Sequence, residues 1–470
     1  MVVQFCGLLR NFLVARVIAP EQFGIAAALA MSISLVEMLG DLGAGRFLTR
    51  ASGEDGDAWL RVAHGISVCR GIIAGVLLLL LAEPLAQLMK MPEATWAFRI
   101  VALVPPIRGF THNQIWLAQR DLRFKAMVAT QAVPQVFLLL IAYPVAVWIP
   151  DFRALLWLLM ANVVLTVVLS HVVARKPYRL GFDAQKVRQL LTFGLPLLGD
   201  GLLMFAVLHG ERIVIANHYS KALLGAYSAA FLLAWTPAAV IGRVGFSLGV
   251  PQLASLRNSP EARARQYAIG VRAMAAPALG LAILFGLSGR ELIAAVFGSD
   301  YVLPAGFAAW LGLGYAFRIL RNPPAVIAVA DGYTVSPMAG NFVRVIGVGA
   351  GWTLAARGAE PSAVMVCGAL GEVGALILMA IINARRLSIP AVTHLGPSAV
   401  VGLGFFGALA LTQIAPLPTG PFVRTLIGLS AGGFAVVAWT IANPATRHLA
   451  LDFTKHHLRR QPISPANAEL

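Results

Sequence analysis

The sequence predicts an all-α membrane protein that crosses the bilayer many times. Of its 470 residues, 58% are apolar and only 12% are charged. The apolar residues fall into about fourteen stretches of roughly 18 to 25 residues, each long enough to cross a bilayer of about 30 Å as a helix. Helices are indicated because lipid offers unpaired backbone groups no partner, and the stretches lack the alternation of a membrane barrel.

The predicted spans are separated by short connections, and a polar tail follows Asn443. The spans are 1–18, 24–46, 60–82, 94–118, 126–148, 153–173, 190–216, 222–248, 267–288, 303–329, 336–356, 362–383, 395–415 and 422–442.

Positive charge alternates along these connections, except that the one around Asp331–Ser336 has no Lys or Arg. The formal net charge is +16, which in a soluble protein would suggest nucleic acid as a partner. The richer connections contain Arg46 and Arg50; Arg120, Arg123 and Lys125; Arg175, Lys176, Arg179, Lys186 and Arg188; Arg257, Arg263 and Arg265; Arg385 and Arg386; and Arg447, Lys455, Arg459 and Arg460. The intervening ones hold Lys90, Arg153, Lys221, Arg290, Arg357 and Arg424. The positive-inside bias therefore predicts that both termini and the richer connections are cytoplasmic, where anionic lipid accounts for the surplus charge.

The chain also contains an internal sequence repeat. Ala15–Gly24 corresponds without a gap to Ala216–Gly225, and a proline pair in the fourth span has a counterpart in the tenth. Both matches relate span n to span n+6. Because an even offset preserves the orientation of a span in the membrane, the matches predict two six-helix lobes that are parallel repeats, followed by two extra helices. The alternative is a chance agreement of small and apolar residues. The predicted divisions are two lobes, two extra helices and a cytoplasmic tail, at 1–175, 176–384, 385–443 and 444–470.

The paired prolines at the matching points are Pro105 with Pro106 and Pro323 with Pro324. Proline removes a helical hydrogen bond and bends the helix. Two interpretations stay open: a tolerated structural kink, or a hinge for alternating access.

Arginines inside the apolar spans are the strongest functional signal. Near the middle of a membrane each costs at least about 2.5 kcal/mol, so it normally faces a wet cavity or a partner. Acidic residues in the spans are too few to pair with all of them, which points to a bound anion. The candidates for a cavity are Arg10, Arg16, Arg212 and Arg272. Arg16 lies near the end of its span, which also permits an interfacial role.

Three acidic residues in the spans are candidate counter-ions or coupling sites for protons or sodium, namely Glu37, Asp41 and Glu211. No spacing typical of a metal site, a nucleotide loop or a catalytic nucleophile occurs, so we expect no metal, no cofactor and no catalytic residue. The three cysteines lie singly in apolar spans and are expected to be buried small residues.

Four stretches resemble a known family: Leu13–Gly24, Leu117–Phe124, Phe193–Ser228 and Val250–Leu256. Their order and spacing are similar to the bacterial oligosaccharide flippases of the polysaccharide-transporter family, within the multidrug/oligosaccharidyl-lipid/polysaccharide exporter superfamily. The resemblance covers about the first 260 residues well. The pair Arg10 and Arg16 is also similar to two first-helix arginines of the related lipid II flippases.

Two departures from the family pattern stand out. Glu211 occupies a position where the family commonly has an aspartate. Family members also usually have more residues before the first span, which leaves open a late start at Met1.

The resemblance implies a flippase of the bacterial inner membrane. Its substrate would be an oligosaccharide unit of lipopolysaccharide or exopolysaccharide, linked through pyrophosphate to undecaprenol and moved from the cytoplasmic to the outer leaflet. The cavity arginines would hold the pyrophosphate, and protons, sodium or the membrane potential would drive the cycle. Polysaccharide polymerase and assembly proteins are possible partners. The alternatives are a multidrug antiporter of the same superfamily, a membrane-embedded polysaccharide polymerase or ligase, and a scaffold without transport.

Overall fold

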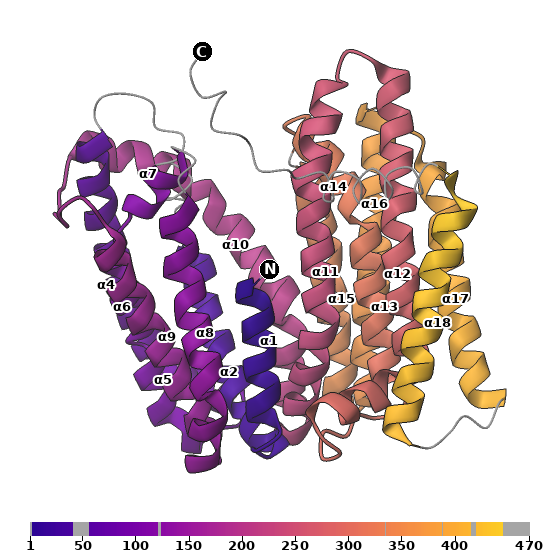
Figure 1. Ribbon diagram of the computed structural model, residues 1–470, viewed down its shortest axis with the longest axis horizontal. Helices are drawn as coiled ribbons and strands as arrows, with labels where there is room; N and C mark the ends of the chain where they lie inside the picture. The colour runs from indigo at the N-terminus through magenta and orange to yellow at the C-terminus, as the bar shows by residue number, and fades with distance from the viewer. Residues whose placement is uncertain are drawn as a thin grey trace, which may run out of the picture. The chain divides into compact units, whose positions relative to one another are not determined.

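The computed structural model describes residues 2–40, 56–120, 124–333, 335–387, 389–414 and 420–444. These residues form helices joined by turns and contain no strand (Figure 1). Within the described residues, each predicted span overlaps one helix or a series of shorter helices. The prediction of an all-α, polytopic membrane protein is therefore confirmed.

The helices that match unbroken spans are α1 (Val2–Ala15), α2 (Pro20–Gly40), α4 (Gly56–Leu88), α8 (Phe124–Trp148), α9 (Phe152–Val173), α10 (Ala184–His218), α11 (Lys221–Ser255), α12 (Pro260–Phe297), α15 (Val335–Ala356), α16 (Pro361–Leu387), α17 (Leu395–Ile414) and α18 (Pro421–Ala442). Within the described part, 8 helices are long and apolar enough to cross a membrane. The fourth and tenth predicted spans are not among them, because they are broken into shorter helices.

The contacts of the chain define two compact units. Unit 1 comprises Met1–Thr236, Arg290–Leu311 and Asn341–Gly371, and unit 2 comprises the remaining segments. The division falls inside several helices; in α12 it follows Ser288, whose backbone (φ −144°, ψ 19°) departs from helical geometry. These units group residues by their contacts, whereas the predicted lobes were defined by a sequence repeat. The two divisions therefore do not test each other, and the lobe boundaries at 175, 384 and 443 stay a prediction.

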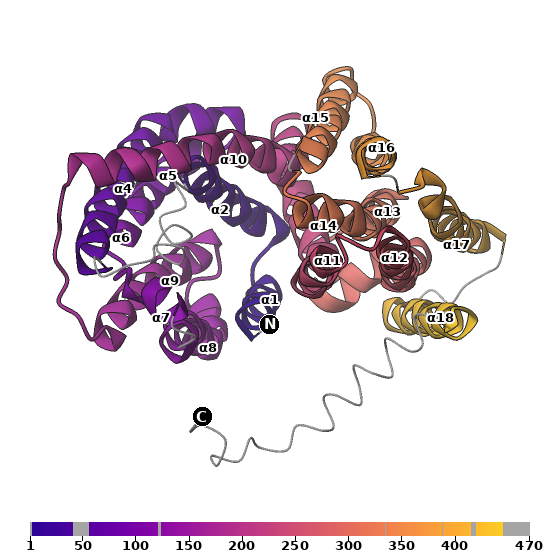
Figure 2. The same ribbon diagram turned by 90° about the horizontal axis from the view of Figure 1, so that it is seen from above.

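Unit 1 is organised around α2. This helix packs against α4, α9 and α10, while α1 packs against α8 and α8 against α9 (Figure 2). Alanines make up much of the first half of α2, in the run Gly24–Ala30, and their small side chains leave space beside the helix. In unit 2 the first part of α12 lies against α17 and α18, where Gly280 meets Gly432.

Both proline pairs mark a break in a helix. In the fourth span, α5 (Thr95–Val101) ends and α6 (Val104–Gly109) begins at the first pair; α7 (Gln114–Arg120) follows. In the tenth span, α13 (Phe307–Leu320) ends and α14 (Asn322–Ala330) begins at the second pair. The residues just before the new helices, Leu103 (φ −76°, ψ −16°) and Arg321 (φ −77°, ψ −10°), have the same backbone conformation.

Proline is tolerated in the first turn of a helix, where its missing N–H has no intrahelical acceptor. The sequence repeat thus corresponds to two similar helix breaks, whereas a hinge role for them stays a prediction.

The first break is held by glycines of α4. A Cβ on Gly71 would lie 2.6 Å from the Pro105 carbonyl oxygen, and one on Gly75 would lie 2.5 Å from Cγ of Pro106. Glycine is required there for the close approach of the two helices.

Candidate functional site: a cationic pocket in unit 1

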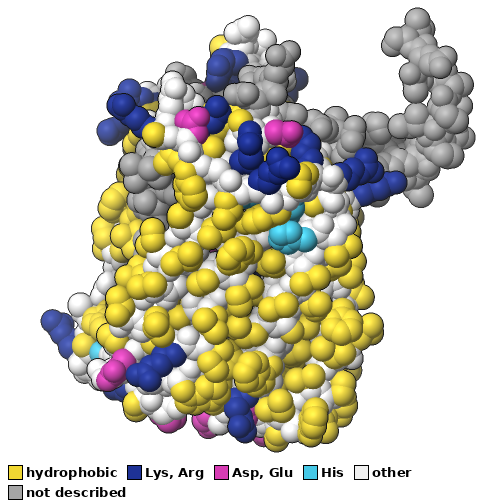
Figure 3. Space-filling view, turned by 90° about the vertical axis from the view of Figure 1, so that its left-hand side faces the viewer, with side chains coloured by type: hydrophobic (Ala, Val, Ile, Leu, Met, Phe, Trp, Pro, Cys, Tyr) yellow, Lys and Arg dark blue, Asp and Glu magenta, His cyan; other side chains and the backbone are white. Residues whose placement is uncertain are grey.

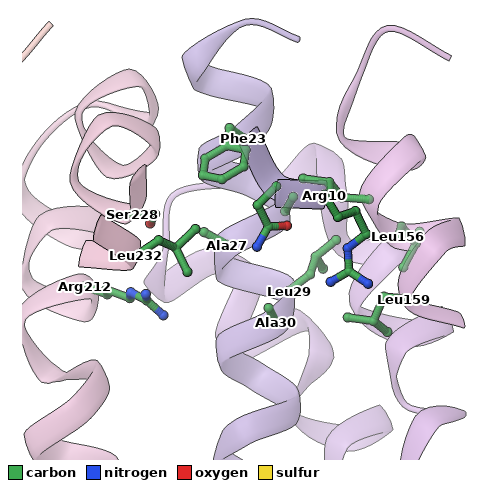
Figure 4. Close-up of a pocket in the computed structure, with 13 residues that line it drawn as sticks. Arg10, Phe23, Ala27, Leu29, Ala30, Leu156, Leu159, Arg212, Ser228 and Leu232 are labelled. Carbon is green, nitrogen blue, oxygen red and sulfur yellow. The ribbon is translucent and has the colours of Figure 1, made fainter. Parts of the chain in front are cut away.

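A pocket of about 160 Å³ opens beside α2 within unit 1. It is lined by Arg10 and Asn11 of α1, Phe23, Ala26, Ala27, Leu29 and Ala30 of α2, Leu155, Leu156 and Leu159 of α9, Arg212 of α10, and Ser228 and Leu232 of α11. Two of the four predicted cavity arginines, Arg10 and Arg212, are therefore brought together by the fold. Figure 4 shows their guanidinium groups entering from opposite sides, with Ala27, Leu29 and Ala30 between them.

Arg10 is positioned by polar groups of two neighbouring helices. Its Nη1 donates a weak hydrogen bond to Oε1 of Gln135 (3.4 Å), and the Gln135 amide donates to Oδ1 of Asn162 (3.2 Å). The buried Nε of Arg10 has no hydrogen-bond partner among the described residues. Gln135 thus orients the guanidinium and leaves donor capacity for a further acceptor, since an arginine has five N–H groups.

Arg212 contacts an aromatic ring and a histidine. Its side chain is buried, and its guanidinium carbon lies 3.8 Å from the centroid of the Phe231 ring. Nη1 also lies 3.4 Å from Nδ1 of His209, whose ring stacks on Phe205 with 5.0 Å between centroids. Stacking on an aromatic face fixes the plane of the guanidinium.

The lining of this pocket favours an anion. Two guanidinium groups line it, and no carboxylate does among the described residues. Guanidinium offers planar paired donors that match phosphate oxygens in a charge-assisted, bidentate contact. Because ligand pockets for whole small molecules usually measure about 300–1,000 Å³, this conformation has room for a phosphate-sized group but not for an oligosaccharide.

The other two arginines lie outside this pocket. The Arg16 side chain is exposed, and its Nε donates to the Val296 carbonyl oxygen (2.7 Å). Its Nη2 donates to the Ala295 carbonyl oxygen in the same last turn of α12. Arg272 is exposed on α12 in unit 2, and its carbonyl oxygen accepts a hydrogen bond from Trp439 (2.8 Å). Their role in substrate binding stays a prediction.

The acidic candidates have separate surroundings. Glu37 forms an ion pair with Arg108, and both side chains are about two-fifths exposed (36% and 41%). Glu211 accepts a hydrogen bond from the Tyr227 hydroxyl (2.7 Å). Asp41 lies outside the described residues. The Glu37 pair fits the counter-ion interpretation, and coupling of any of the three to an ion stays a prediction.

Sequence reasoning missed the residues that position the two arginines. Gln135 and Asn162 are polar residues inside apolar spans, a signal that was available because such residues normally face a protein interior. The role of Phe231 had no such signal, since an aromatic residue in a membrane helix is ordinarily part of the packing.

The fold and the pocket define a multi-pass, all-α membrane protein with a cationic site among its helices. Residues 13–303, more than half of the chain, match the family described as "Polysaccharide biosynthesis protein". The chain belongs to this family.

Two curated relatives share about a quarter of their aligned residues with the chain. Succinoglycan biosynthesis transport protein ExoT of Rhizobium meliloti (strain 1021) is 24% identical over 393 residues, 80% of this chain and 74% of that protein. Lipopolysaccharide biosynthesis protein WzxC of Escherichia coli (strain K12) is 24% identical over 261 residues, 54% of this chain and 52% of that protein.

Two solved structures are similar in fold at low sequence identity. The lipid II flippase MurJ, in an inward closed conformation, has a TM-score of 0.70 at 12% identity and covers 93% of this chain and 96% of its own. An inward-facing multidrug resistance MATE family transporter has a TM-score of 0.60 at 13% identity and covers 88% and 96%. The all-α fold with two lobes, expected from the apolar spans and the repeats, is thereby confirmed.

Proposed function

We propose that this protein is a flippase for lipid-linked oligosaccharides in the bacterial inner membrane. It moves an undecaprenyl-pyrophosphate-linked unit of lipopolysaccharide or exopolysaccharide from the cytoplasmic to the outer leaflet, with both of its own termini in the cytoplasm. The names of the two curated relatives, one a transport protein for succinoglycan and the other a lipopolysaccharide biosynthesis protein, support this assignment.

The observation that carries the proposal is the pair Arg10 and Arg212 on one pocket without a carboxylate. A diphosphate cannot cross about 30 Å of hydrocarbon unaided, because desolvating its charge is costly. Two guanidinium groups replace the lost water with charge-assisted hydrogen bonds. No bond of the substrate is made or broken in such a step, so the residues act by binding alone.

The remaining site residues have supporting roles in this proposal. Arg16 and Arg272 would meet the substrate in other conformations of the cycle. Glu37, Asp41 and Glu211 would couple the cycle to protons or sodium, and the breaks at the proline pairs would absorb the change in helix direction.

The test is transport by single variants in a host that lacks its own flippase. Arg10→Ala and Arg212→Ala are each expected to lower export of the finished polysaccharide by about tenfold or more, the loss of one hydrogen bond to a charged group. Arg10→Lys and Arg212→Lys keep the charge without the planar fork and should retain part of the export. Arg243→Ala is the matched control, because Arg243 is an exposed arginine of α11 outside the pocket.

Membrane abundance is measured for each variant, so that loss of protein is not mistaken for loss of transport. Full export by both alanine variants at normal abundance would contradict the proposal. Efflux of cationic dyes that depends on Glu37 or Glu211, without any export of polysaccharide, would favour the multidrug antiporter instead.

A further inference from the structure

A second cationic cavity lies in unit 1, where α4 begins. Its volume is about 180 Å³, and it is lined by the first turns of α4 and by the connection between α9 and α10. Three cations converge on it: Arg61 from α4, and Lys176 and Arg179 from the connection. None of the residues assigned to the proposed transport site contributes to this cavity.

The charge of this cavity is only partly neutralised. Lys176 forms an ion pair with Asp57, the one carboxylate of the lining. Arg61 and Arg179 form no ion pair within the described ranges, and both side chains are exposed. Three cations face one carboxylate in this lining, so the cavity keeps a net positive charge and attracts an anion of phosphate size.

The connection that carries Lys176 and Arg179 is fixed in place by hydrogen bonds. Its Gly181 N–H donates to the Arg61 carbonyl oxygen (3.0 Å). The Gln114 side-chain oxygen accepts the N–H groups of Arg175 (2.8 Å) and Lys176 (2.9 Å). These bonds preorganise the cations, so a ligand need not order a loose loop when it binds.

Two buried histidines complete this support. Nε2 of His64 accepts the Asn113 N–H (3.0 Å), so Nδ1 donates to the Arg179 carbonyl oxygen (3.1 Å). Nδ1 of His112 accepts the Gln114 N–H (3.2 Å), so Nε2 donates to the Lys176 carbonyl oxygen (2.9 Å). Each ring is thereby a neutral tautomer with both nitrogens engaged. The histidines therefore position the connection, and the two arginines are the groups that bind the anion.

Apolar side chains follow directly after the cations. Leu180 is 50% exposed and Phe182 is 67% exposed, although both stand in a polar connection. The face of the molecule in Figure 3 shows Lys and Arg side chains gathered along the rim of a broad hydrophobic band. Cations at such a rim with apolar groups beside them match the headgroup and the acyl chains of a lipid.

We propose that this cavity binds the headgroup phosphate of an anionic phospholipid, with Arg61 and Arg179 on the phosphate and Leu180 and Phe182 against the acyl chains. Basic pockets between membrane helices bind anionic headgroups in this manner. The cavity volume suits a single phosphate group and excludes a sugar chain.

The test measures lipid retention by the purified full-length protein, using native mass spectrometry in mixed micelles of phosphatidylglycerol and phosphatidylcholine. The wild type is expected to retain phosphatidylglycerol preferentially. The double variant Arg61→Gln/Arg179→Gln should bind it about 30-fold more weakly, since each cation near an anionic surface contributes about fivefold. Arg61→Lys/Arg179→Lys should retain most of the preference.

The matched control is Arg265→Gln/Arg385→Gln, which removes the same charge from two exposed arginines on other basic connections. It is expected to keep the preference for phosphatidylglycerol. Leu180→Ser/Phe182→Ser should also weaken retention of the lipid, because the acyl chains lose their apolar contact while both arginines are kept.

Equal retention of the two lipids by the wild type would overturn the proposal, as would an unchanged preference in the Arg61→Gln/Arg179→Gln variant. Displacement of the lipid by millimolar inorganic phosphate alone would assign the cavity to a free anion instead. Preferential retention of undecaprenyl pyrophosphate over phosphatidylglycerol would assign it to the transported lipid.

Discussion

Gly24 and Gly225 pack against each other in a reciprocal contact. A Cβ on Gly24 would meet the Lys221 carbonyl oxygen, and a Cβ on Gly225 would meet the Pro20 carbonyl oxygen. Each of these Cβ positions lies 3.1 Å from the backbone nitrogen of the other glycine. The two glycines are equivalent in the sequence repeat, and so are Pro20 and Lys221. Such reciprocity is the property of a contact on a two-fold axis, which here relates the starts of α2 and α11 within unit 1.

This contact predicts that neither glycine tolerates a side chain. Gly24→Ala or Gly225→Ala would force the two helices apart against backbone atoms, which cannot rotate away as a side chain can. We expect each to cost about 1–3 kcal/mol and to lower membrane abundance. Gly7→Ala is the control, because a Cβ on Gly7 meets nothing within 4 Å. Normal abundance and thermal stability of both alanine variants would show that the close approach is not needed.

A different prediction concerns Arg16, which caps the C-terminal turn of α12 through the carbonyl oxygens of Ala295 and Val296. A cation there satisfies carbonyls without an intrahelical partner and faces the negative end of the helix dipole. Arg16→Ala should therefore lower thermal stability by about 1–2 kcal/mol, with Arg16→Lys restoring much of it. The measurement is the unfolding midpoint in detergent, beside export per unit of protein. Unchanged stability with reduced export would instead place Arg16 in substrate binding.

The orientation of the chain is a further prediction, and it rests on the alternation of basic connections. Reporter fusions after Lys125, Arg188 and Arg265 are expected to be cytoplasmic, and a fusion after Asp300 external. The measurement is the activity of a paired cytoplasmic and periplasmic reporter at each site. A periplasmic signal at Arg188 would reverse the orientation, and with it the direction of transport that we propose.

The sequence predicted the fold better than the site, for physical reasons. Span length and loop charge are local properties, so the spans could be read directly, and Gly24 with Gly225 could be aligned from the repeat. Arg10 and Arg212 were singled out because charge at membrane depth is costly. Their meeting at one pocket depends on packing between α1, α2 and α10, which no local pattern encodes. The cap formed by Arg16 depends on carbonyl oxygens about 280 residues away in sequence.

Glu372 lies between two arginines in unit 2, and we expect its carboxylate to stabilise the fold. Its Oε2 accepts a hydrogen bond from Nε of Arg321 (3.2 Å), and its Oε1 lies 3.9 Å from Nη1 of Arg318. All three side chains are nearly buried, at 9–13% exposure. Arg321 is also the residue just before α14, whose first turn contains the second proline pair, so the carboxylate holds the helix break in place.

Removing that carboxylate would leave the buried Arg321 without its counter-charge. Glu372→Gln is therefore expected to cost about 3–5 kcal/mol, whereas Glu372→Leu/Arg321→Met should cost less because it removes a charge from each side. The measurement is a double-mutant cycle on the unfolding midpoint, with Arg321→Met as the other single variant. A substantial favourable coupling between the two positions is expected. Additive effects would mean that Glu372 and Arg321 stabilise the break independently, which would contradict the prediction.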